Sequence, residues 1–443
     1  MKKEKVALVR YKEPLESVKE AVALGEGLKG LPPRAKVFIK PNIVVWPWAG
    51  QFPKWGVITT SRIVEDMVRL LKDSGAREII IGEGLVTWRP GDDQSPEQAF
   101  ASLGYYEMER RYGVKVLNLH KRPFRKVALG KVSLLFNNDL LESDFLVNLP
   151  VLKTHCQTVV SLGMKNLKGT LDISSRKKCH NPQTGVNLDE YVSLLGNKLP
   201  PSLTLIDGIY SLERGPGFGG RAYRSDLLIA SANLVAADFV GALLLGHDPS
   251  KVPHLAMAAQ YQNLPPDSSW IKIVGESLGS TIRYHPWEYP YAEDGTRPLS
   301  FIKKEIQGIS YPKYDQSLCT YCFLLDGFIQ AAIREAWKGK PFDQIEILTG
   351  KIRRPSPGYQ KTVLLGQCMC RFNHDHPNIQ KEIPIKGCPP TLKNIIQGLG
   401  KAGIEVKGGL LDGLENGPGP STSRYEGHPE FSENFFQVSS GNY

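Results

Sequence analysis

TTSRIVEDMVRLLKDSGAREIIIGEG, residues 59–84, predicts a helix followed by a buried strand. Apolar residues at 63, 67, 70 and 71 share one helical face, and a hydroxyl side chain of Thr59–Ser61 is available as the N-cap. Gly75 suits the C-terminal end of this helix, and REIIIGEG follows as a strand. Because KVFIK (36–40) supplies a strand before the helix, the order strand, helix, strand indicates a parallel sheet with helices packed on it.

The same alternation extends along the chain on both sides of this unit. Further strands are predicted at 4–10, 112–119, 143–153, 202–209 and 270–276, a helix near 15–28, a hairpin at 126–137, and a strand followed by an apolar helix at 226–246. The predicted fold class is therefore α/β, a mostly parallel sheet with flanking helices over residues 1–290, plus a C-terminal cysteine-rich metal-cluster module at 291–410. Residues 411–443, poor in aliphatic side chains, are predicted to be an extended or partly disordered tail.

Composition excludes several classes of protein and limits the partners. The 443 residues are 41% hydrophobic and 23% charged, which excludes a disordered chain, a collagen and a coiled coil. No apolar run reaches the length of about 18 residues that a spanning helix needs, and the N-terminus lacks an apolar signal-peptide core, so no membrane association and a cytoplasmic location are expected. The net charge of +10 suggests an anionic partner, but the basic runs are short. Nucleic acid is therefore disfavoured, and a small anion is the expected partner.

The seven cysteines are unevenly distributed. The count is odd and no export signal is visible, so a disulfide framework is not expected. Five of the seven form the pattern CTYC (319–322), then 45 residues, then CMC (368–370), then 16 residues, then GCPP (387–390). Two thiolates two residues apart in a turn, closed by a distant pair, are typical ligands of zinc or of an iron–sulfur cluster. The alternative to a metal site is that these cysteines are buried as free thiols.

The choice between an iron–sulfur cluster and zinc rests on the neighbours of these cysteines. Proline follows Cys388, as is common at cluster sites, and an apolar helical run follows Cys322. His374 and His376, close to the CMC pair, keep zinc as the alternative. One [4Fe–4S] cluster is the expected cofactor. Its expected ligands are Cys319, Cys322, Cys368 and Cys388, with Cys370 as the substitute for Cys368.

Lysines recur where predicted strands end. The elements are Lys40-Pro41-Asn42, Lys153-Thr154-His155 and the run Gly163–Gly169, which contains Lys165, Asn166 and Lys168. In an open α/β sheet, ligands bind outside the carboxyl ends of the strands. These side chains together suit a carboxylate or a phosphate, and the alternative is a set of solvated surface lysines.

A glycine-rich segment extends the candidate anion site. Asp207 precedes RGPGFGG (214–220), in which glycines allow a backbone to approach an anion closely. Asp207, Arg214, Gly217 and Gly219 are therefore candidate substrate-binding residues, together with Lys40, Asn42, Asn166 and Lys168. The segment matches neither a Walker loop nor a dinucleotide fingerprint, and a flexible surface loop is the alternative.

The ordered set of motifs resembles the domain-of-unknown-function family numbered 362, often labelled uncharacterised iron–sulfur centre proteins. Besides the stretch at 59–84, the motifs are KPN (40–42), LVNLPVLKTH (146–155), GMKNLKG (163–169), IDGI (206–209), GPGFGG (215–220) and ADFVGALLLGHDP (237–249). The resemblance covers residues 4–280. Many members carry two four-cysteine ferredoxin runs, which this chain lacks, so a single cluster is the form that fits here. In outline the family's fold is also similar to the amino-terminal half of nickel-pincer lactate racemases, but only His155 and His180 are near candidates for the paired histidines of such an enzyme.

The leading hypothesis is an iron–sulfur oxidoreductase that acts on a small anionic substrate. Lys153, His155 and Lys165 are the candidate catalytic residues, and His155 is the expected proton donor because the charge of histidine changes near neutral pH. An electron-transfer protein is a further candidate partner. The alternatives are a non-catalytic binding or carrier protein with structural zinc, and a racemase-like or lyase-like enzyme without redox chemistry.

Overall fold

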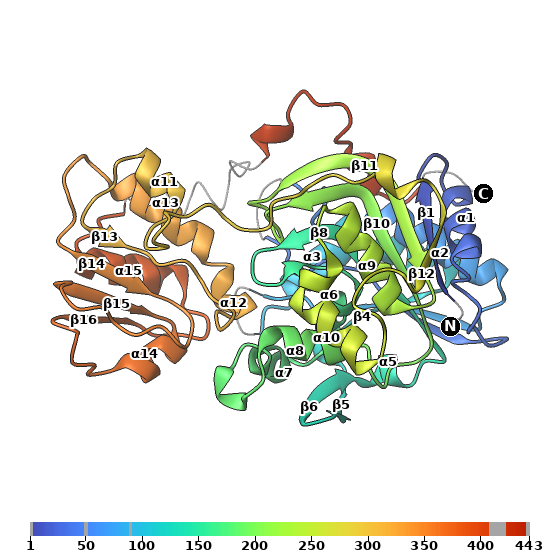
Figure 1. The fold of residues 1–443 in the computed structure, drawn as a ribbon, viewed down its shortest axis with the longest axis horizontal. Coiled ribbons are helices and arrows are strands. Elements are labelled where there is room, and N and C mark those ends of the chain that lie inside the picture. Colours follow the sequence, from blue (N-terminus) through green and yellow to red (C-terminus); the bar gives the residue numbers. More distant parts are fainter. Residues whose placement is uncertain (1–2, 48–51, 88–90, 407–421, 440–443) are drawn as a thin grey trace.

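The chain forms two α/β parts, shown in Figure 1 as a large sheet at the right and a small sheet at the left. The computed structural model describes residues 3–47, 52–87, 91–406 and 422–439. Within these residues no helix is long and apolar enough to cross a membrane.

The large sheet is mixed and mostly parallel, as the strand–helix alternation predicts. Its order is β12 (Ile271–Gly275), β1 (Glu4–Arg10), β11 (Arg221–Ser231), β10 (Ser202–Glu213), β7 (Phe145–Asn148), β2 (Lys36–Lys40), β3 (Glu78–Glu83) and β4 (Lys115–Asn118), with β8 (Val151–His155) beside β10 and β9 (Val159–Val160) beside β8. Strand β11 runs antiparallel to both of its neighbours, β1 and β10. The predicted strand at 143–153 is two strands, because Pro150 interrupts it and has no amide to donate.

Helices cover both faces of the large sheet because its strands bury apolar side chains on both sides. In β2, Val37 and Ile39 join one core and Phe38 joins the other. The first core includes residues of α1 (Glu16–Leu24), α2 (Ser61–Asp73), α3 (Gln94–Ser102) and α4 (Tyr105–Tyr112); the second includes residues of α8 (Leu188–Leu194), α9 (Leu234–Leu244) and α10 (Pro253–Tyr261). The predicted hairpin at 126–137 forms from β5 (Phe124–Leu129) and β6 (Val132–Asn137).

Helix α2 confirms the helix predicted after Thr60, with one correction at its start. No hydroxyl caps it: the N-cap residue Thr60 makes no side-chain cap bond. The carboxylate of Asp207 instead accepts the Thr60 N–H at 2.7 Å. Gly75, with φ of +78°, follows the helix in the left-handed conformation that glycine favours.

The small part is a four-stranded parallel sheet, which the sequence analysis did not predict. Its order is β13 (Ile309–Ser310), β14 (Ile345–Leu348), β15 (Lys361–Leu365) and β16 (Glu382–Ile385). Its helices include α11 (Leu299–Lys303), α12 (Thr320–Phe323), α13 (Asp326–Ala336), α14 (Gln367–Asn373) and α15 (Leu392–Ala402). A separate apolar core lies between sheet and helices. The expected helix after Cys322 is broken into α12 and α13.

The described part of the tail, residues 422–439, packs on the large domain. Tyr425 and Phe431 lie against the indole of Trp55, with ring centroids at 5.2 and 5.5 Å. The predicted extended tail is therefore corrected here, because aromatic side chains supply the apolar area that aliphatic residues lack. The remainder of the predicted tail, 411–421 and 440–443, lies outside the described residues.

Candidate functional site

The predicted lysines are largely buried and are not solvated surface residues. Lys40 ends β2, Lys153 lies in β8, Lys165 in α6 (Gly163–Asn166) and Lys168 in the 3-10 turn that follows. Lys40, Lys153 and Lys168 are exposed by only 1%, 0% and 8%, and Lys165 is half-buried. A buried ammonium group needs compensation, so the partners of each lysine decide what it can do.

Lys40 is compensated within the domain by Glu83, a residue that the sequence analysis missed. Their ion pair has an Nζ–Oε1 distance of 2.8 Å and is almost completely buried. Glu83 also accepts the backbone N–H groups of Ile43 and Gly84. Burial lowers the pKa of Lys40, and the Glu83 carboxylate opposes that shift. The ion pair joins the last residues of β2 and β3. Lys40 therefore positions the strand ends beside the site.

Lys153 has only backbone carbonyls as partners. Its ammonium donates to the Val57 oxygen at 2.7 Å and to the Pro216 oxygen at 3.4 Å. Burial lowers its pKa from the ordinary 10.5 to about 7, with Glu83 opposing and Lys40 adding to the shift. Lys153 can therefore exchange a proton near neutral pH.

His155 and Lys165 lie within the field of the neighbouring lysines. Burial, and then the charge of Lys168, depresses the pKa of Lys165 well below its ordinary value, and Lys153 adds to that effect. Burial and the charges of Lys165, Lys168 and Lys153 likewise hold the pKa of His155 well below 6.5. Burial therefore favours the neutral form of His155 near pH 7, where the sequence analysis expected a change of charge. Its Nδ1 accepts the Gln157 N–H at 3.0 Å, which leaves Nε2 to carry the proton of a neutral ring.

Lys168 joins His180, which the sequence analysis had considered only as a racemase histidine. The Lys168 ammonium donates to His180 Nε2, while His180 Nδ1 donates to the Gln316 oxygen at 2.7 Å. Lys168 also approaches the Thr320 hydroxyl at 3.4 Å. Burial lowers the pKa of Lys168 to about 8, and the thiols of Cys179 and Cys319 oppose the shift. In the described part of the chain no ion pair joins Lys153, Lys165 or Lys168 to a carboxylate.

The neutral candidates and Asp207 are engaged in holding the backbone. Asn42 donates to the same Val57 oxygen as Lys153, at 2.7 Å. Asn166 donates to the Lys40 carbonyl and to Asn148. Asp207 accepts backbone N–H groups through both oxygens, one from Thr60 and one from Ile209. These contacts give the three side chains a structural role, and their part in ligand binding stays a prediction.

The glycine-rich segment lies against β8. A Cβ at Gly215 would come within 2.3 Å of the Thr154 oxygen, so the close approach requires glycine there. Arg214 pairs with Glu213 at 3.6 Å. A Cβ at Gly217 would meet nothing within 4 Å, and one at Gly219 would lie 3.5 Å from the Tyr289 hydroxyl. The segment reaches the lysines through the Pro216 carbonyl, which accepts from Lys153.

Four cysteines of the small part lie near enough for their charges to act on one another. Cys319 and Cys322 flank the start of α12, Cys368 follows β15, and Cys388 follows β16. A hydrogen bond from the Cys322 thiol holds the pKa of Cys319 below that of an ordinary thiol. The pKa of Cys322 is raised, first by the same hydrogen bond and then by burial and by the charges of Cys319, Cys388 and Cys368. The thiol of Cys370 instead donates to the Leu364 oxygen at 3.2 Å.

The spacing of these sulfurs bears on the metal they could hold. Tetrahedral zinc, with Zn–S bonds of about 2.3 Å, needs sulfurs roughly 4 Å apart. Among the described residues, the only group of three or more ligand atoms within 4.8 Å of one another is His374, Asp375 and Glu382, which contains no cysteine. An iron–sulfur cluster binds each thiolate through a different iron and takes more widely spaced sulfurs. Gly366 lies beside Cys322 Sγ and has a φ of +93°, in the left-handed region that favours glycine.

The lysine site and the cysteine set border each other. Lys168 approaches Thr320, which lies between Cys319 and Cys322. Lys351, after β14, donates to the carbonyl oxygens of His180 at 2.8 Å and Ser317 at 2.6 Å. In Figure 1, α12 faces the large domain at this junction.

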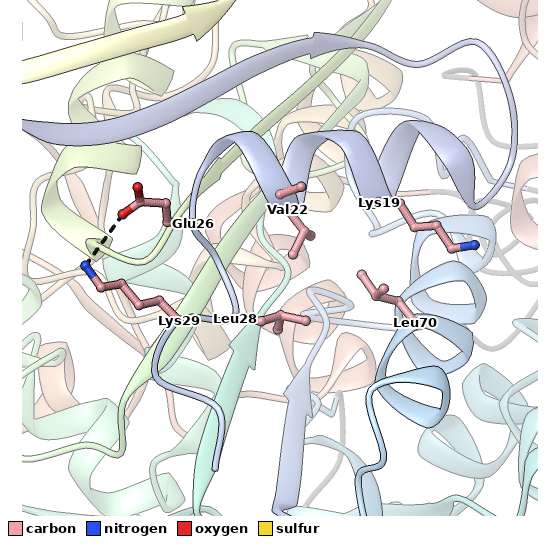
Figure 2. A pocket seen from close by; sticks show the side chains of 7 residues that line it. Lys19, Val22, Glu26, Leu28, Lys29 and Leu70 are labelled. Atoms are coloured by element: carbon pink, nitrogen blue, oxygen red, sulfur yellow. Dashed lines mark ion pairs between the residues drawn. The ribbon is translucent and has the colours of Figure 1, made fainter. Parts of the chain in front are cut away.

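A separate surface hollow of about 450 Å³ lies by α1. Figure 2 shows its lining side chains, with Glu26 and Lys29 at one side and Lys19 and Leu70 at the other. Lys29 and Glu26 pair at 3.6 Å. The hollow contains none of the candidate site residues.

Fold and site define an α/β protein with a buried lysine cluster next to a cysteine set. Residues 37–243 match the family model "Domain of unknown function (DUF362)", so this part of the chain carries that domain. The family resemblance noted from the motifs is thereby confirmed.

Two further comparisons found distant similarities. The thylakoid-associated protein sll1697 of Synechocystis sp. is 24% identical over 234 residues, which are 52% of this chain and 68% of that protein. Among solved structures, the lactate racemase apoprotein from Thermoanaerobacterium thermosaccharolyticum matches with a TM-score of 0.31 and 15% identity. That match covers 54% of this chain and 57% of the racemase chain.

Proposed function

We propose that the chain is an iron–sulfur enzyme that carries out redox or cluster-assisted chemistry on a small carboxylate or phosphate. The observation that carries the proposal is the junction at Lys168. This buried ammonium approaches Thr320, between two of the four converging cysteines, and belongs to a lysine set without carboxylate partners. Cys319, Cys322, Cys368 and Cys388 would hold one [4Fe–4S] cluster, and Lys153, Lys165 and Lys168 would bind the anion.

The electrostatics of the lysine set favour an anionic ligand. Burying cations without negatively charged partners is costly, and the depressed pKa values of Lys153 and Lys165 reflect that cost. A bound anion supplies the missing negative charge, and its attraction is weakly screened in a buried site. Lys153 would exchange a proton with the substrate. The neutral ring of His155 would donate a hydrogen bond to the substrate from Nε2. The bound cluster would supply electrons, delivered by an electron-transfer protein. If one iron lacked a protein ligand, the cluster would instead act as a Lewis acid on the substrate.

Anion affinity should fall as pH rises through the range in which these lysines lose their protons. The anion binds the charged form, and the pKa values of Lys153 and Lys168 are about 7 and 8 in the free protein. If the bound anion raises the pKa of one of these lysines by one unit, the anion should bind about tenfold more weakly at high pH than at low pH. Titration calorimetry with inorganic phosphate and with lactate, from pH 6 to 9, measures this. An affinity that rises with pH contradicts the proposal.

The whole proposal is tested by metal analysis combined with anion binding. We expect anaerobically purified protein to be brown, with four irons and matching sulfide per chain, whereas a colourless protein with stoichiometric zinc supports a carrier with a structural metal.

Lys153→Ala should lose at least about tenfold in anion affinity and keep its iron, since this lysine does not contact the cysteines. Lys126→Ala, on the exposed strand β5, is the matched control and should change neither quantity.

A further inference from the structure

One lysine of the large domain makes a direct contact with a cysteine of the small domain. Lys177, in α7 (Ile173–Lys178), places its Nζ 3.2 Å from Cys388 Sγ. The same ammonium lies 5.0 Å from the ring centroid of Tyr321, which separates Cys319 from Cys322 in the chain. Lys177 therefore adds a positive charge and a hydrogen-bond donor to the cysteine set.

The backbone of α7 is fixed to the large domain, so this contact joins the two domains. Asp172 caps the helix by accepting from Ser174 and Ser175. The Arg176 guanidinium donates to the carbonyl oxygens of Leu171 and Gly84. The next residue, Lys178, donates to the Ser133 oxygen at 3.1 Å, inside the large domain. Among these three consecutive basic side chains, Lys177 is the one that reaches a cysteine.

We propose that Lys177 raises the reduction potential of the cluster and couples its redox state to docking of the two domains. This inference rests on the proposed function, because it assumes that Cys388 is a cluster ligand. In the step concerned, an external one-electron donor such as dithionite is oxidised and the cluster gains one electron. No covalent bond changes, and Lys177 keeps its proton. Hydrogen bonds to cluster sulfurs and nearby positive charge favour the reduced, more negative form.

The coupling must act in both directions. If the contact made by Lys177 favours reduction, then reduction favours that contact by the same factor. Two other bonds across the junction have neutral acceptors: Gln157 donates to the Leu318 oxygen at 2.9 Å, and Lys351 donates to the His180 oxygen at 2.8 Å. Their strength depends less on the charge of the cluster. Lys177 thus makes the docking of the domains tighter in the reduced protein.

The test compares Lys177→Gln with Lys177→Arg, and uses Lys178→Gln as the matched control one residue away. Iron and sulfide content is measured first, and then the midpoint potential by a redox titration followed by electron paramagnetic resonance. In Lys177→Gln we expect the ratio of reduced to oxidised cluster at a fixed potential to fall about tenfold, which is a shift of about 59 mV for one electron. Lys177→Arg should recover most of the shift, because it restores the charge and a donor. Lys178→Gln should match the wild type.

Domain docking is measured by amide hydrogen exchange in the segments 172–180 and 315–323, which meet at the junction through the bond between His180 and Gln316. When exchange follows the undocked population, reduction should slow it about tenfold in the wild type and leave Lys177→Gln unaffected. An iron-loaded Lys177→Gln with an unchanged potential overturns this inference alone. Wild-type protein that binds no iron overturns the proposed function and this inference with it.

Discussion

Replacing Cys319 or Cys388 with alanine is expected to remove most of the bound iron. Each residue would supply one of four thiolates, and the two lie on separate segments, at α12 and after β16. Because metal binding is coupled to folding, the variants should also loosen residues 315–400, where the small sheet and its helices lie. Iron and sulfide analysis gives the loss, and amide hydrogen exchange gives the change in local stability.

The matched comparison lies within the CMC pair. Cys370→Ala should retain more iron than Cys368→Ala, because the Cys370 thiol donates to the Leu364 carbonyl while Cys368 is exposed beside the other sulfurs. Full retention of iron in Cys319→Ala or Cys388→Ala contradicts the ligand assignment. The reverse order within the CMC pair means that Cys370 is the ligand.

Replacing Glu83 with glutamine is expected to lower the free energy of unfolding by about 3–5 kcal/mol, because it leaves the buried Lys40 charge uncompensated. The substitution keeps the shape of the side chain, so loss of packing does not explain the effect. Urea unfolding followed by far-ultraviolet circular dichroism measures the change. The double variant Lys40→Met with Glu83→Gln should be more stable than Glu83→Gln alone, since the orphaned charge is gone.

An exposed ion pair between neighbouring strands is the control for Glu83. Glu78 in β3 pairs with Lys115 in β4 at 2.7 Å, and the Lys115 side chain is 61% exposed. Glu78→Gln should change the free energy of unfolding by at most about 1 kcal/mol, because water already solvates both groups. Equal effects of Glu78→Gln and Glu83→Gln would show that burial of the pair has no special cost.

Local patterns predicted the large domain well because they are set by neighbouring residues. The helical period after Thr60 and the apolar run REIIIGEG predicted α2 and β3 within a few residues. The small sheet was missed because its strands, such as IEIL (345–348) and EIPI (382–385), are short and carry little periodicity. The direction of β11 was missed too, since a strand's sequence does not state which neighbour it pairs with.

The candidate site was predictable in its residue types and not in its partners. The strand-end rule brought Lys153, Lys165 and Lys168 to one region, where their charges act on His155. Glu83 and Lys351 escaped attention, and the pairing of His180 with Lys168 was missed, because each of these residues meets its partner only through the fold. Lys351 follows β14, so recognition of the small sheet would have drawn attention to it.

The return of residues 422–439 to the large domain affects the order in which the chain can fold during synthesis. Tyr425 and Phe431 cover Trp55, and Ser439 donates to the buried Glu65 of α2. On the ribosome, the whole cysteine-bearing part is made before these residues emerge. The aromatic surface around Trp55 therefore stays open to water, and to chaperones, until residues 422–439 have been made. Contacts between residues this far apart in sequence also raise the contact order, so completion of the large domain should be the slow step of folding.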